Sequence, residues 1–123
     1  MYTIYLKDED MLQPNHFPAI ALVNEAYNSD PLSFIKNLSQ EIGSGYNYTT
    51  CSFWSELDEY DQGQIDKYEG LLVETENGDE VIVSMKEITH YLEIATVRYA
   101  SAIGADCPEL LLQLNHLKEV NCG

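Results

Sequence analysis

The chain opens with stretches in which apolar residues recur every three or four positions, the spacing of one helix face. The first such stretch follows Pro18, and its apolar positions are Ile20, Val23, Ala26 and Tyr27. A second helix is expected from Pro31, because Asp30 can cap it and proline fits its first turn. Its apolar face comprises Leu32, Ile35, Leu38 and Ile42. Gly43 and Gly45 are then expected to end this helix.

The pattern changes at residue 46, where the segment YNYTTCSFW is rich in aromatic residues and Thr, as is typical of a half-buried strand. Two further strands are expected at 71–75 and 80–84. Residues 76–79 between them contain Asn-Gly, which accepts the positive φ angles of a tight hairpin. Residues 1–6 fit either a short strand or a lead into the first helix.

Two more helices complete the pattern. Ser84 and Glu87 form a capping box, and the helix that follows carries Ile88, Leu92, Ala95, Tyr99 and Ile103 and ends at Gly104. The segment Asp106-Cys107-Pro108-Glu109 starts the last helix in the same way as the second, and the expected core face comprises Leu110, Leu111, Leu114 and Leu117. Two helices, a small meander and two helices predict one α+β domain over residues 1–123. Its small antiparallel sheet, a three-stranded meander, would pack with about four helices.

Charge narrows the choice of partner. The sequence has 21 Asp and Glu against 6 Lys and Arg, a formal net charge of −15. Ten of the acids lie between Glu56 and Glu80, where only Lys67 opposes them. Such a chain would repel nucleic acids and anionic membranes, so neither is an expected partner. A basic protein or a cation is favoured, and a charged surface that serves solubility alone is the other interpretation.

Aromatic residues lie in and beside the acidic run: Tyr46, Tyr48, Phe53, Trp54, Tyr60 and Tyr68. Carboxylates mixed with Tyr and Trp resemble one half of an interface whose other half is basic. If residues 46–54 form a strand, Tyr46, Tyr48 and Trp54 share one face. That face fits either the core or a surface beside the acids.

Three cysteines, Cys51, Cys107 and Cys122, occur without a CxxC motif. This odd number indicates free thiols in a reducing compartment. The N-terminus lacks the basic and apolar regions of a signal peptide, and no apolar run approaches the roughly 18 residues of a membrane span. The expected location is the cytoplasm.

A calcium site is one candidate for the acidic run. With Gly63 as the invariant glycine of an EF-hand, Asp58, Asp66 and Glu69 occupy the first, ninth and twelfth positions. The third and fifth positions hold Tyr and Gln where Asp or Asn is needed. A divalent-cation module with loop 58–69 is therefore an alternative function, and no metal or other cofactor is expected in the main interpretation.

Catalytic signals are weak. His16, His90 and His116 have no second ligand at metal-binding spacing, and Cys51 has no histidine near it in sequence. No nucleophile elbow or glycine-rich phosphate loop occurs. These observations predict a binding protein and not an enzyme, with no catalytic residue.

Residues 53–100 resemble the immunity proteins of bacterial contact-dependent growth inhibition (CDI) systems, through FWSELDEYD and YEGLLVETENGDEVIVSMKEITHYLEIATVRYA. The shared features are a glycine before a strand (Gly70), an acidic hairpin (78–80), a Val/Ile strand (81–83) and the Ser84–Glu87 helix start. More narrowly, the segment looks like the group that neutralises ribonuclease toxins of the tRNase type. The resemblance implies a cytoplasmic inhibitor that binds a cognate, basic nuclease toxin domain in a 1:1 complex.

Acidic side chains could take the positions of RNA phosphates on such a toxin. The residues expected to bind it are Glu56, Asp58, Glu59, Tyr60, Asp61, Asp66 and Trp54, with the hairpin acids Glu76 and Asp79 second. A nucleic-acid mimic that acts on a DNA-binding protein rests on the same physics and is a further alternative.

Overall fold

The computed structural model describes residues 2–122, apart from the side chains at positions 121 and 122. It confirms the α+β class, with a sheet of four antiparallel strands where three were expected. The strands lie in the order β1 (Ser44–Gly45), β2 (Thr49–Ser52), β3 (Leu71–Thr75) and β4 (Glu80–Val83). The helices are α1 (Phe17–Tyr27), α2 (Pro31–Ser39), α3 (Glu59–Gln62), α4 (Met85–Ile103) and α5 (Pro108–Cys122). Two 3-10 turns, η1 (Asp8–Asp10) and η2 (Trp54–Glu56), are also present.

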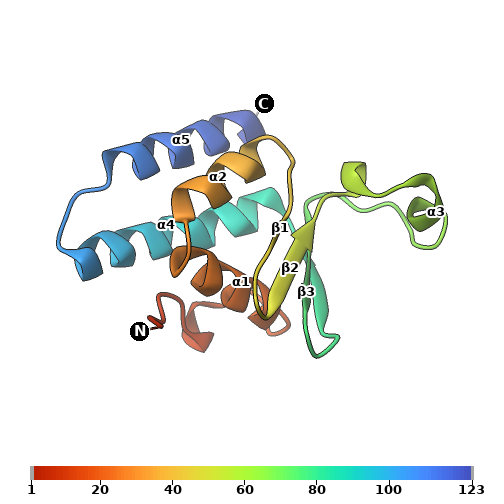
Figure 1. Cartoon of the computed structure of the whole chain (residues 1–123), viewed down its shortest axis with the longest axis horizontal. Coiled ribbons are helices and arrows are strands. Elements are labelled where there is room, and N and C mark those ends of the chain that lie inside the picture. Colours follow the sequence, from red (N-terminus) through yellow and green to blue (C-terminus); the bar gives the residue numbers. More distant parts are fainter. Residues whose placement is uncertain (1, 123) are drawn as a thin grey trace.

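The helices other than α3 cover one side of the sheet (Figure 1). α1 contacts β2, β3 and β4, while α4 packs on α1 and α5 packs on both α2 and α4. The register aligns Leu71 with Val83 and Val73 with Val81, all four buried toward the helices. Ile82 points to the opposite, solvent-facing side of the sheet, where it is exposed.

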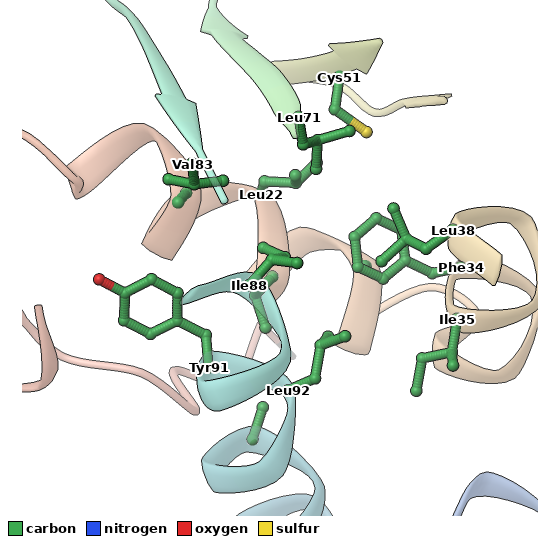
Figure 2. Packing of buried hydrophobic residues seen from close by; sticks show 14 of the residues in the cluster. Leu22, Phe34, Ile35, Leu38, Cys51, Leu71, Val83, Ile88, Tyr91 and Leu92 are labelled. Carbon is green, nitrogen blue, oxygen red and sulfur yellow. The ribbon is translucent and has the colours of Figure 1, made fainter. Parts of the chain in front are cut away.

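One apolar cluster joins these layers (Figure 2). Its buried members come from helices and strands alike: Leu22 in α1, Phe34, Ile35 and Leu38 in α2, Ile88, Tyr91 and Leu92 in α4, and Cys51, Leu71 and Val83 in the sheet. The helices and strands named here therefore bury apolar side chains against one another, as a two-layer domain requires.

The second helix ends earlier than expected. α2 stops at Ser39, and two backbone bonds close it: the N–H of Glu41 donates to Leu38 O at 3.1 Å, and that of Ile42 to Asn37 O at 2.8 Å. This is the Schellman pattern, in which the residue with positive φ is usually glycine. Here it is Glu41, at φ 56°. The prediction that Gly43 and Gly45 end the helix was wrong, and Ile42 is largely exposed.

Gly43 has a different role. A Cβ built there would lie 2.1 Å from the backbone oxygen of Cys51. The glycine thus permits the close approach of β1 to β2. β2 itself is shorter than the predicted 46–54 strand, because η2 begins at Trp54.

Other departures concern single positions. Leu111 and Ile103 were assigned to core faces but are about half exposed, since each lies off the buried side of its helix. Residues 2–6 form neither a strand nor a helix. The buried Asn24 side chain holds them instead, accepting the N–H groups of Tyr5 and Leu6 at 2.9 Å. The free-thiol prediction for Cys122 concerns a side chain that the structure does not describe, while Cys51 and Cys107 are free.

Among residues 2–122, no helix combines the length and the apolar character that a membrane crossing requires.

Candidate functional site

The most exposed acidic segment is the loop of residues 57–67, which carries α3 and is called here the α3 loop. It leaves the sheet and projects away from the helices (Figure 1). Its acids are all exposed: Asp58, Glu59, Asp61 and Asp66. Tyr60 is 73% exposed and Ile65 46%. The loop thus presents carboxylates beside aromatic and aliphatic surface, as an interface does.

Contacts at its base hold the α3 loop in place. The rings of Trp54 and Tyr68 meet edge to face, with centroids 5.7 Å apart at 85°. The Tyr68 hydroxyl donates to Ser52 O at 3.2 Å, and the Gln62 side-chain amide donates to Trp54 O at 3.2 Å. Trp54 is half-buried, so it anchors the loop and still reaches solvent.

Two of the predicted contact acids shape the backbone. The Glu56 carboxylate accepts the N–H of Phe53 at 2.8 Å and that of Gly43 at 2.9 and 3.0 Å. Asp58 caps α3 by accepting the N–H of Asp61 at 2.8 Å. An engaged carboxylate has less freedom to rearrange around a partner. Glu59, Asp61 and Asp66, with Tyr60, are therefore the residues best placed for contact.

The hairpin acids lie elsewhere. Glu76 and Asp79 are exposed at the turn between β3 and β4. The α3 loop departs from the opposite ends of the strands, after Ser52 and before Leu71. A five-residue strand spans roughly 16 Å, so the sheet separates the two acidic groups (Figure 1). The structure brings the loop residues together but not the hairpin residues with them.

The α3 loop carries a net negative charge, since four acids face one lysine, Lys67. The ion pairs within the described residues join His16 to Glu87, Arg98 to Asp10 and Lys118 to Glu93, and none involves the loop. Its carboxylates therefore add to one negative field instead of cancelling internally.

A cavity of about 460 Å³ lies at the base of the α3 loop and is called here the Trp54 cavity. Trp54 and Tyr68 line it, together with Leu38 of α2 and Met85 of α4. Three charged residues also line it: Glu41, Lys67 and Glu69. Sequence reasoning missed Glu41, since a positive φ at a glutamate has no sequence signal.

The predicted aromatic face is divided between core and surface. Tyr46 is half-buried against Phe34, with ring centroids 6.2 Å apart, and burial raises the pKa of its hydroxyl to about 12. Tyr48 is also half-buried, and its hydroxyl accepts from the Asn77 side chain at 3.1 Å. Both rings therefore belong to the scaffold more than to the α3 loop.

Residues with possible chemistry are held structurally. His16 is buried, with Nδ1 2.6 Å from the Tyr91 hydroxyl and Nε2 3.7 Å from Glu87. Burial raises the pKa of the Cys51 thiol to about 11, which keeps it protonated. Within residues 2–122, no three His, Cys, Asp or Glu side chains are grouped as a metal site would need.

Comparisons with known proteins give a family match. No curated protein matches the chain in sequence. The sequence model of the family described as CDI immunity protein matches residues 9–107, most of the chain and a longer stretch than the 53–100 that carried the resemblance. Members of such a family protect a cell by binding a cognate CDI toxin. The chain belongs to the CDI immunity protein family.

Proposed function

We propose that this chain inhibits a basic ribonuclease toxin domain by forming a 1:1 complex with it in the cytoplasm. The α3 loop would cover the toxin surface on which RNA phosphates bind. The observation that carries this proposal is the exposed acidity of that loop, which has four carboxylates against one lysine. The protein itself would have no catalytic role, because it acts by occupying the toxin.

The electrostatic reasoning follows from the substrate. A ribonuclease must bind a polyanion, so its RNA-binding cleft is basic. Carboxylates at the positions of phosphates would complement that cleft and accelerate encounter, toward about 10⁸–10⁹ M⁻¹s⁻¹ at low salt. Rapid capture suits an inhibitor of an enzyme that arrives already active.

Roles can be assigned along the loop. Glu59, Asp61 and Asp66 would contact basic groups, and Tyr60 would supply exposed aromatic area. Three further residues would act from the base of the loop: Glu56 and Asp58 by shaping the backbone, and Trp54 by anchoring it. The hairpin acids Glu76 and Asp79 would contribute long-range attraction only.

The test uses the cognate CDI toxin domain, titrated with wild-type protein while RNA cleavage is measured. We expect complete inhibition at one equivalent. The triple variant Glu59→Gln/Asp61→Asn/Asp66→Asn should raise the dissociation constant by about 100-fold or more, since three charged contacts are lost.

A charge change at the hairpin is the control. The variant Glu76→Gln/Asp79→Asn should raise the constant by less than about fivefold. Equal losses in both variants would contradict the assignment of the contact to the α3 loop. Full cleavage in the presence of excess wild-type protein would contradict inhibition itself.

A further inference from the structure

The Trp54 cavity lies where the α3 loop joins the body. Trp54 and Tyr68 form the loop side of it, and Leu38, Met85 and Val120 form the side of the helical body. The cavity therefore combines an aromatic wall with aliphatic surface, next to the acids proposed to contact the toxin.

Short contacts fix the walls of this cavity before any partner binds. Tyr68 is 8% exposed and bonds to Ser52 through its hydroxyl. Gly70, at φ 90°, lets β3 approach β4: a Cβ there would lie 2.3 Å from the backbone oxygen of Val83. The Glu56 carboxylate accepts the N–H groups of Phe53 and Gly43, and so joins the two segments that contain them. A preformed site loses little conformational entropy on binding.

Two glutamates and one lysine are among the residues that line the cavity: Glu41, Glu69 and Lys67. The lining therefore carries one net negative charge. None of the three forms an ion pair within the part of the chain that the structure describes. Glu41 is also held at φ 56°, a conformation costly for a residue other than glycine. Backbone strain of this kind concentrates at ligand-binding sites.

We propose that the Trp54 cavity receives one arginine side chain of the toxin, an inference that rests on the proposed function. The methylenes of arginine match the aliphatic wall, and a guanidinium stacks on aromatic rings. The planar guanidinium can also donate hydrogen bonds to two carboxylates in fixed directions, whereas the ammonium of lysine acts as a point charge. This contact is separate from the acids at the tip of the α3 loop.

The experiment measures binding of the purified toxin domain by calorimetry to three variants of the full chain. Glu41→Gln/Glu69→Gln removes the carboxylates of the cavity, and we expect binding at least tenfold weaker. Asp106→Asn/Glu109→Gln removes the same charge from exposed positions just before α5 and in its first turn, and should weaken binding less than threefold. Lys67→Gln removes the competing cation, and should tighten binding about threefold.

Replacing each arginine of the toxin by methionine identifies the occupant. In a double-mutant cycle with Glu41→Gln, the replacement of one arginine should show a coupling of tenfold or more in the dissociation constant. The replacements of the other arginines should show no such coupling. Thermal unfolding of each variant establishes that it is folded.

The outcomes separate the two proposals. If wild-type protein binds but the cavity variant and its charge-matched control weaken equally, the arginine site is overturned and the inhibitor function stands. Weaker binding by Lys67→Gln would point to an anionic occupant and also overturn the site. If wild-type protein forms no complex with the toxin domain, both proposals fall.

Discussion

At the scale of single residues, Glu41 is the residue whose type is least suited to its backbone dihedral angles. It completes the Schellman motif of α2 at φ 56°, where Gly104 occupies the corresponding position after α4 at φ 69°. Glu41→Gly should raise the free energy of unfolding by about 0.5–1 kcal/mol, since the relieved strain exceeds the added chain entropy. Chemical denaturation measures this change.

Gln40→Gly is the control for that prediction. Gln40 lies one residue earlier, at φ −105°, where glycine relieves no strain. The free energy of unfolding should therefore fall. If both glycine variants were destabilised equally, the strain at Glu41 would be negligible.

The buried thiol of Cys51 offers a second prediction at this scale. With its pKa raised to about 11, about one native thiol in a thousand is ionised at pH 8. In Cys107→Ser/Cys122→Ser protein, a thiol reagent at pH 8 should label Cys51 slowly until denaturant is added. Rapid labelling of the native variant would show that the thiol is accessible.

The same shift in pKa affects stability at alkaline pH. The unfolded thiol ionises near its ordinary value of 9.0, while the folded thiol stays protonated until about 11. The contribution of the protonated Cys51 thiol to the free energy of unfolding is therefore complete below pH 9 and is lost as the pH rises toward 11. Cys51→Ala should flatten this part of the curve of unfolding free energy against pH.

At the scale of elements, sequence reasoning succeeded where local chemistry decides the structure. Asp30 caps α2 by accepting the N–H of Ser33 at 3.1 Å. Ser84 and Glu87 form the expected reciprocal cap of α4, at 3.0 and 2.9 Å. The Asn-Gly hairpin joins β3 and β4, with Gly78 at φ 92°. Each of these depends on residues a few positions apart, so the sequence pattern was sufficient.

Sequence reasoning failed where distant segments determine the structure. β1 forms because Gly43 can approach Cys51, a contact that no periodicity encodes. The acidic run likewise could not distinguish Glu56, which holds Gly43, from Glu59, which is exposed. The acids of the candidate site can therefore be read from the sequence, but the division between those that hold the backbone and those that do not cannot.

That division is testable at the base of the α3 loop. Glu56→Ala leaves the N–H groups of Phe53 and Gly43 with water as their acceptor, and should lower the free energy of unfolding by about 0.5–1.5 kcal/mol. Asp61→Asn should change the free energy of unfolding by less than about 0.5 kcal/mol, because the Asp61 carboxylate is exposed to solvent. Thermal and chemical unfolding of both variants measure the difference. Equal stability of the two would show that the Glu56 bonds are unimportant.

At the scale of the whole molecule, the net charge of −15 governs encounter with a partner. If the partner is basic, raising the salt from about 50 to 500 mM should slow association by tenfold or more and change dissociation much less. Stopped-flow mixing with the toxin domain measures both rates. The triple loop variant should show a weaker salt dependence. An association rate that is independent of salt would contradict electrostatic steering.

The projection of the α3 loop beyond the helices also bears on how such a protein evolves. Tyr60 and Ile65 are largely exposed, so replacing them does not disturb the cluster that joins the layers. Mutations at the tip of the loop can therefore accumulate without loss of foldability, as long as Glu56, Trp54 and Tyr68 hold its base. A lineage could follow a changing toxin through substitutions in about ten positions while it inherits the rest of the scaffold unaltered.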